Sequence, residues 1–219
     1  NPLSKWKILD NLRRSLTPIF NVIFTLLAFA ILPGNVIFWL TLPLINIFFP
    51  VILATLNHLL SRGRMKRERI SGDMFFGIKS ALVQSLLRYV FLPHNGMVMG
   101  DAIIRTLYRL KISRKNLLQW TTAAEAERRC SNDAAGYVKR MRASYLVPVL
   151  TIITAYWSSP ARIILALVLS IPWIFSPWIA YRISQEKERE EAIREEDRQT
   201  LSRLSRKIWA FYEDFAGVE

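Results

Sequence analysis

The chain has 219 residues, of which 52% are hydrophobic, and a formal net charge of +13 at pH 7. Its single cysteine, Cys130, excludes an internal disulfide and a zinc site built from several cysteines. A charge of this size is compatible with nucleic-acid binding. The basic residues flank long apolar segments, however, so we expect anionic membrane lipids as partners and no nucleic acid.

Residues 1–16 have the pattern of an amphipathic helix. Apolar residues recur at helical spacing from Trp6 to Leu16, and four basic residues, including Arg13 and Arg14, surround them. We expect this segment to lie in the membrane interface and to lead into the bilayer, although an ordinary juxtamembrane helix has the same pattern.

Residues 17–60 are predicted to form a first transmembrane hairpin. The 44 residues from Thr17 to Leu60 contain no Asp, Glu, Lys or Arg, and an uncharged apolar stretch of about 18 residues already indicates a membrane span. The sequence PGN at 33–35 predicts the turn between two spans. Pro43 and Pro50 are expected to kink the second span.

Residues 61–142 are predicted to form cytoplasmic or interfacial helices. One of these helices carries a polar stripe on an otherwise apolar surface, formed by Asp73, Gly77, Ser80, Gln84 and Arg88. The stripe favours a helix at the interface, and a tilted third span remains open. Pro93 is expected to end this helix, with PHNG at 93–96 interpreted as a turn.

Two further features lie in the same region. Asp101 and Arg105 have the spacing of an ion pair on one helix face. The segment 113–129 is predicted to be a helix that docks on neighbouring protein, with Leu117, Trp120 and Ala124 on one face.

Residues 143–182 are predicted to form a second transmembrane hairpin, because Arg162 is the only formally charged residue between Ala143 and Tyr181. Its turn is expected at 158–161. Residues 183–219 combine many charges with helix-forming residues and predict a charged cytoplasmic helix that links to a following domain. The expected fold is therefore an all-α integral membrane module with two transmembrane hairpins.

The distribution of basic residues predicts the topology. The turns at 33–35 and 158–161 contain no Lys or Arg, whereas residues 1–16, 61–142 and 182–219 contain four, seventeen and eight. Basic segments favour the cytoplasmic side, so both ends of the chain are expected inside.

The residue types predict no catalytic centre. The two histidines, His58 and His94, lie far apart in sequence without metal-ligand spacing, and no phosphate loop or nucleophile elbow is present. No cofactor, metal or catalytic residue is therefore expected in this chain.

Three stretches resemble the membrane region of bacterial cyclic β-1,2-glucan synthases: LSKWKILDNLRRSL at 3–16, DAIIRTLYRLKISRKNLLQWTTAAEAE at 101–127 and LSRKIWAFYEDFAG at 204–217. In that family this region lies between a processive glycosyltransferase domain and carbohydrate-active domains of glycoside-phosphorylase type. The resemblance spans nearly the whole chain in the same order.

The resemblance implies a chain cut from a larger inner-membrane enzyme that uses UDP-glucose, with a divalent metal, Mg²⁺ or Mn²⁺, in the transferase domain. The catalytic and primer-attachment residues would lie outside these 219 residues. Arg13 and Arg14 would then meet donor phosphates, lipid headgroups or a structural partner. Two other functions remain open: a transporter or channel subunit, and a passive membrane anchor or scaffold.

Overall fold

The computed structural model describes residues 1–61, 70–115, 132–185 and 195–216, together with Thr122, Glu125 and Arg128. Within these residues all regular structure is helical, which confirms the predicted all-α fold. The chain divides into two compact units, Asn1–Ser184 and Gln185–Glu219.

The first unit contains α-helices and two short helices of other types, the π-helix η1 and the 3-10 helix η2. They are α1 (Pro2–Ala30), α2 (Val36–Ser61), α3 (Ile70–Val90), α4 (Leu92–Tyr108), η1 (Arg109–Ser113), α6 (Ala134–Met141), η2 (Arg142–Tyr145), α7 (Leu146–Ser158), α8 (Pro160–Ile174) and α9 (Ser176–Ser184). The second unit contains α10 (Glu195–Ala216).

Helix α1 joins two segments that the sequence pattern treats separately. The amphipathic residues 1–16 and the apolar residues that follow form one helix of 29 residues. At 1.5 Å per residue such a helix is roughly 43 Å long, which exceeds the roughly 30 Å apolar core of a bilayer. The side chain of Asn1 caps the helix by accepting a hydrogen bond from the backbone N–H of Leu3, at 3.1 Å. A continuous helix therefore carries the charged and the apolar parts.

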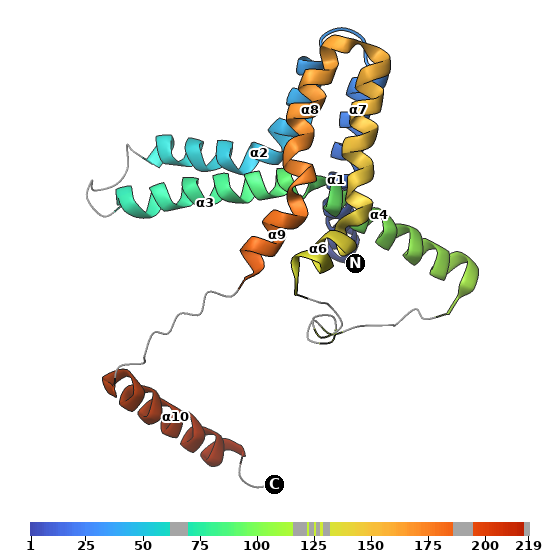
Figure 1. Cartoon of the computed structure of the whole chain (residues 1–219). Helices are drawn as coiled ribbons and strands as arrows, with labels where there is room; N and C mark the ends of the chain where they lie inside the picture. The colour runs from blue at the N-terminus through green and yellow to red at the C-terminus, as the bar shows by residue number, and fades with distance from the viewer. Residues whose placement is uncertain are drawn as a thin grey trace. The chain divides into compact units, whose positions relative to one another are not determined.

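Helices α1, α7, α8 and the first part of α2 pack side by side as a bundle (Figure 1). Six fully or almost fully buried residues form its core near the two turns, with Phe29 at the centre and no exposed surface. These core residues are Ala28, Phe29, Val36, Leu40, Ala155 and Ala166. Small alanines on α7 and α8 allow α7 to approach both α1 and α8 closely, as is common between membrane helices.

Helix α2 changes direction along its length. Its first part packs against α1, and its second part runs beside α3 and away from the bundle (Figure 1). Pro43 and Pro50 both lie inside the helix, and each lacks the N–H that would continue the helical hydrogen bonding. The predicted kink in the second apolar segment is confirmed.

The sequence PHNG at 93–96 does not form a turn, so that interpretation was wrong. These residues make the first turn of α4, with Pro93 in a position where its missing N–H costs nothing. A side chain at Gly96 would place its Cβ 3.0 Å from Cγ2 of Val22 and 3.5 Å from the carbonyl oxygen of Pro18. Gly96 is thus the point at which α4 crosses α1 closely.

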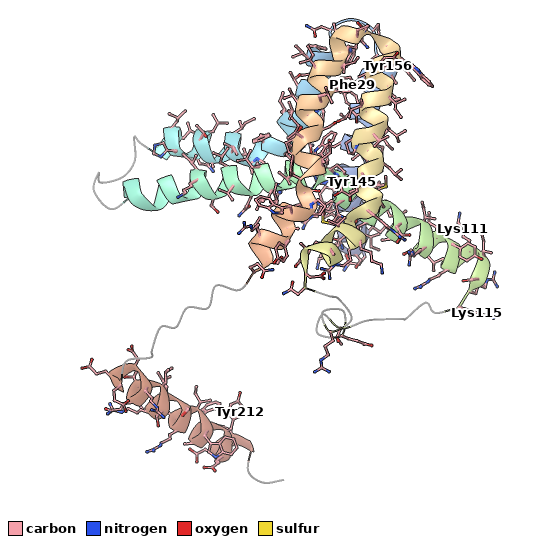
Figure 2. All side chains as sticks on the ribbon, in the orientation of Figure 1. Phe29, Lys111, Lys115, Tyr145, Tyr156 and Tyr212 are labelled. Carbon is pink, nitrogen blue, oxygen red and sulfur yellow. The ribbon has the colours of Figure 1, made fainter. Side chains whose placement is uncertain are left out.

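Both predicted turns exist and lie at the same end of the bundle. Residues 31–35 separate α1 from α2, and Ser159 separates α7 from α8. Figure 2 shows Phe29 and Tyr156 towards this end of the bundle and Tyr145 at the opposite end of α7. Among the described residues, three helical stretches are long and apolar enough to cross a membrane: Pro2–Ala30, Val36–Leu60 and Pro160–Ser184. Helix α7, with 13 residues, is shorter than these.

The outer surfaces of the bundle helices are apolar and exposed. On α7 and α8 this surface includes Trp157, Ile164 and Val168, with exposed fractions of 82%, 72% and 59%. An apolar surface of this extent is unusual on a soluble protein and is typical of helices in contact with lipid. The fold and its surface therefore define a helical membrane protein.

Helix α10 is amphipathic in its own right. Its first turn carries Glu195, Glu196 and Asp197. Their negative charges interact favourably with the positive end of the helix dipole and stabilise the start of the helix. Its apolar side chains recur at alternating spacings of three and four and are all exposed within this unit: Leu201, Leu204, Ile208, Phe211 and Phe215.

Candidate functional site

A pocket of about 370 Å³ lies between α1, α2, α3 and α4, lined by both polar and apolar side chains. Two arginines, three asparagines and a threonine supply its polar lining, and three apolar residues complete it. The lining residues are Arg14, Thr17, Pro18, Asn21, Asn46, Ile47, Arg88, Leu92 and Asn95. The volume is within the usual range for small-ligand pockets, roughly 300–1,000 Å³. None of these described lining residues is acidic.

Arg14 reaches the pocket from α1, at the boundary between the charged and the apolar parts of the helix. Asp10, one turn earlier, binds both neighbouring arginines: its Oδ2 lies 2.6 Å from Nη2 of Arg14, and its Oδ1 lies 2.8 Å from Nη2 of Arg13. Arg14 lines the pocket and Arg13 does not. The two arginines, which the sequence analysis considered together, therefore have different surroundings: only Arg14 lines the pocket.

Arg88 reaches the pocket from α3. It makes no ion pair or side-chain hydrogen bond within the part of the chain that the structure describes. It belongs to the predicted polar stripe, of which Gly77, Ser80, Gln84 and Arg88 are exposed. The amide of Gln84 donates to the hydroxyl of Ser80 at 3.4 Å, which ties two members of the stripe together.

The asparagines join α1 to α2 across the pocket. Nδ2 of Asn21 donates a hydrogen bond to Oδ1 of Asn46, at 3.2 Å. Asn46 lies between Pro43 and Pro50, where α2 bends. The bend carries the second part of α2 away from the bundle, and the pocket opens beside it.

At the opposite end of the bundle, Arg162 donates hydrogen bonds to backbone carbonyl groups. Its Nη1 donates to the carbonyl oxygen of Phe29 and its Nη2 to that of Gly34, both at 3.3 Å. The hydroxyl of Ser158 also donates to the carbonyl of Phe29. The last carbonyls of a helix have no partners within the helix, so these side chains cap α1 and join the two turns.

Tyr89 and Trp173 fix α3 to α8. The hydroxyl of Tyr89 donates to the carbonyl oxygen of Leu169 at 2.9 Å, and Nε1 of Trp173 donates to the carbonyl oxygen of Tyr89 at 3.0 Å. Their ring centroids are 5.6 Å apart, and Trp173 is only 2% exposed. Because Tyr89 directly follows Arg88, this contact holds Arg88 at the pocket.

His94, on α4, is half-buried, and its Nδ1 lies 3.3 Å from the hydroxyl oxygen of Ser144. Burial disfavours the charged imidazolium and holds the pKa of His94 below its ordinary value. The contact ties α4 to η2, below α7.

The remaining predicted site residues are placed as follows. Nε of Arg105 lies 2.7 Å from Oδ1 of Asp101, so the predicted ion pair is present, with both side chains exposed. The docking face of Leu117, Trp120 and Ala124 lies outside the described residues. Its role stays a prediction.

Sequence reasoning missed the meeting of four helices at one pocket. It singled out Arg14 and Arg88, but on two separate helices and in separate contexts. Asn95 was hidden in a segment interpreted as a turn. A single polar residue on each of several helices produces no periodic pattern in the sequence. The meeting of these residues becomes visible only in the structure, where α2 bends.

Among the described residues that line the pocket, the titratable members are two arginines, which stay charged at any physiological pH. Among the described residues, no group of three His, Cys, Asp or Glu is placed to hold a metal ion. The described lining of the pocket therefore carries positive charge from two arginines, at a meeting point of four helices.

No protein-family model matches the chain. The chain is similar to the protein named cyclic beta-(1,2)-glucan synthase NdvB of Rhizobium meliloti (strain 1021), with 28% identity over 225 residues. The match covers 99% of this chain and 8% of that protein, so the chain spans a small part of its relative's length. The resemblance to cyclic β-1,2-glucan synthases that the sequence predicts is confirmed at this level.

Proposed function

We propose that residues 1–219 form the membrane module of a glucan synthase that makes cyclic β-1,2-glucan from UDP-glucose. The observation that carries the proposal is the similarity to the Rhizobium glucan synthase over 99% of the chain. Three helical stretches suited to crossing a membrane support a membrane role for the matched region.

In this proposal the module anchors and supports the transferase and contains no catalytic centre of its own. Its partners are membrane lipids and, within the full-length protein, a glycosyltransferase domain and domains of glycoside-phosphorylase type. UDP-glucose, the growing glucan and a divalent metal, Mg²⁺ or Mn²⁺, bind to the transferase domain. The two arginines and three asparagines among the described lining residues of the pocket support a binding role.

We propose further that the module lies in the bacterial inner membrane with both ends in the cytoplasm. The two turns lie together at one end of the bundle, as this topology requires. In intact cells, Ser159→Cys should react with an impermeant thiol reagent, whereas native Cys130 should not. Labelling of Cys130 from outside would contradict this topology.

The function is tested with membranes that contain the full-length protein. We expect labelled UDP-glucose to be converted to cyclic β-1,2-glucan, identified by mass and by linkage analysis. A membrane preparation that lacks the protein is the control. Absence of any glucan product from folded, correctly inserted protein would contradict the proposal.

The supporting role is tested separately from the reaction. Asp101→Asn removes an exposed carboxylate and its ion pair with Arg105, and we expect normal synthesis because the pair is worth only about 0–1 kcal/mol at the surface. His58→Gln should also leave synthesis intact. Loss of synthesis in either variant, with unchanged protein amount and thermal stability, would show direct participation in catalysis.

One observation favours a second function, that of a transporter subunit. A polar pocket at the bend of a proline-interrupted helix is an arrangement found at transport sites. A transporter would move a solute across vesicles without UDP-glucose. A passive anchor, in contrast, would retain full synthesis after replacement of the pocket residues.

A further inference from the structure

We propose that the pocket between α1, α2, α3 and α4 binds the phosphate group of an anionic phospholipid. Arg14 and Arg88 would hold the phosphate oxygens, and the amides of Asn21, Asn46 and Asn95 would bind the remaining polar atoms of the headgroup. The inference does not depend on the reaction of the full-length protein. It requires only that the helices lie in a bilayer.

The charge of the pocket indicates an anion. Two guanidinium groups line it, and none of the described lining residues carries a carboxylate. Asp10 offsets part of the charge of Arg14, while Arg88 has no acidic partner within the described residues. Guanidinium groups bind phosphate oxygens through paired, charge-assisted hydrogen bonds, so the pocket offers two such donors to one ligand.

The lining favours a phosphate over a sugar. Sugar rings are commonly bound on aromatic side chains and by carboxylates that accept bonds from hydroxyl groups, and the described lining residues include neither. Its apolar residues, Pro18, Ile47 and Leu92, are aliphatic. A glucan chain would therefore find hydrogen-bond donors but no surface on which a ring can stack.

The surroundings favour a lipid over a soluble phosphate. On α2, Ile45 and Phe49 lie within three positions of Asn46 and are 52% and 50% exposed. On α3, Leu86 lies two positions before Arg88 and is 47% exposed. Arg14 lies where the uncharged stretch that begins at Thr17 meets the charged start of α1. Basic pockets between membrane helices at the headgroup level bind anionic lipids. The acyl chains would follow the exposed apolar surface.

The experiment uses the full-length protein purified in a nonionic detergent. Thermal unfolding is followed while phosphatidylglycerol, or phosphatidylcholine as the zwitterionic control, is added in steps. A ligand that binds only the folded state raises the unfolding temperature with concentration, which yields an apparent Kd. We expect stabilisation by phosphatidylglycerol and much less by phosphatidylcholine.

Arg14→Gln and Arg88→Gln should each weaken phosphatidylglycerol binding about tenfold, the loss expected for one hydrogen-bonded charged partner. Arg88→Lys should retain part of the affinity, and it keeps the test open if Arg88→Gln does not fold. Two variants with the same loss of charge serve as matched controls: Arg13→Gln, which shares Asp10 but does not line the pocket, and Lys79→Gln, on the same helix as Arg88. Both controls should bind the lipid as the unmodified protein does.

Three results would overturn the proposal. Equal weakening in Arg13→Gln or Lys79→Gln would show attraction by net charge alone. Protection by inorganic phosphate or UDP that depends on Arg88 would assign the pocket to a soluble phosphate. Protection by a glucose oligomer that depends on Arg88 would assign it to the glucan.

Discussion

The two ends of the helical bundle use arginine in different ways. At the end with the turns, the guanidinium of Arg162 is half-buried and donates to the carbonyl oxygens of Phe29 and Gly34. At the pocket, Arg88 is exposed and has no such partner in the described part of the chain. Both residues interrupt long apolar surfaces, where an unpartnered charge is costly.

The difference shows how a cation in a membrane helix is to be interpreted. Where helix ends leave carbonyls without donors, the arginine completes the backbone and its role is structural. Where the neighbouring side chains are amides and a second arginine, no group in the described part of the fold neutralises the charge. In our proposal, an anionic ligand does so. Position in the helix alone does not distinguish the two cases.

The largest expected effect comes from separating the pocket helices from the bundle. Trp173→Ala removes a buried ring and leaves the carbonyl of Tyr89 without its donor. We expect the free energy of unfolding in detergent to fall by about 3–5 kcal/mol. Trp173→Phe retains most of the volume and should lose less, about 1–3 kcal/mol. A Trp173→Ala protein as stable as the unmodified one would contradict the joining role of this contact.

A smaller effect is expected from removing the cap at the turns. Arg162→Gln leaves two backbone carbonyls without their charged donor, so the free energy of unfolding should fall by about 1–3 kcal/mol. Binding of phosphatidylglycerol should not change, because Arg162 is at the other end of the bundle. Arg105→Gln, which breaks only an exposed pair, should cost no more than about 1 kcal/mol. Equal stability losses in the two variants would remove the distinction.

The pocket end should also respond to acid through His94. Burial lowers the pKa of this imidazole in the folded state, so the folded state favours the neutral ring. Its contribution to stability is complete above the ordinary histidine pKa of about 6.5 and is lost as the pH falls through the lowered value. The unfolding temperature in detergent should therefore drop more between pH 7 and 5 for the unmodified protein than for His94→Gln. Parallel pH profiles would contradict this assignment.

Features that depend on local chemistry were predictable from the sequence. An uncharged stretch with PGN in its middle predicts two helices with a turn, and the structure contains both. Pro43 and Pro50 predict a kink, because proline removes a backbone donor wherever it lies in a helix. The Asp101–Arg105 pair likewise follows from helical spacing alone.

Features that depend on which helices meet were not predictable in this way. His94, Asn95 and Gly96 resemble turn residues when read locally. In the structure they belong to α4, which crosses α1 at Gly96, where the backbone of Pro18 and the side chain of Val22 lie close by. Tertiary packing decides the matter here and outweighs the local tendency to form a turn. The pocket depends on the same crossing and on the direction that α2 takes after its bend.

The smallest change in the free energy of unfolding is expected for Arg88, the residue that we propose binds the lipid phosphate directly. Arg88→Gln removes an exposed cation that makes no bond within the described structure, so the free energy of unfolding in lipid-free detergent should change by no more than about 0.5 kcal/mol. In the presence of phosphatidylglycerol the same variant should be less stable than the unmodified protein, because it gains less from the bound lipid. The two measurements together separate a ligand-binding arginine from a structural one such as Arg162, whose replacement should cost stability equally with and without lipid. A large loss for Arg88→Gln in lipid-free detergent would place Arg88 with Arg162 and remove the contrast between the two ends.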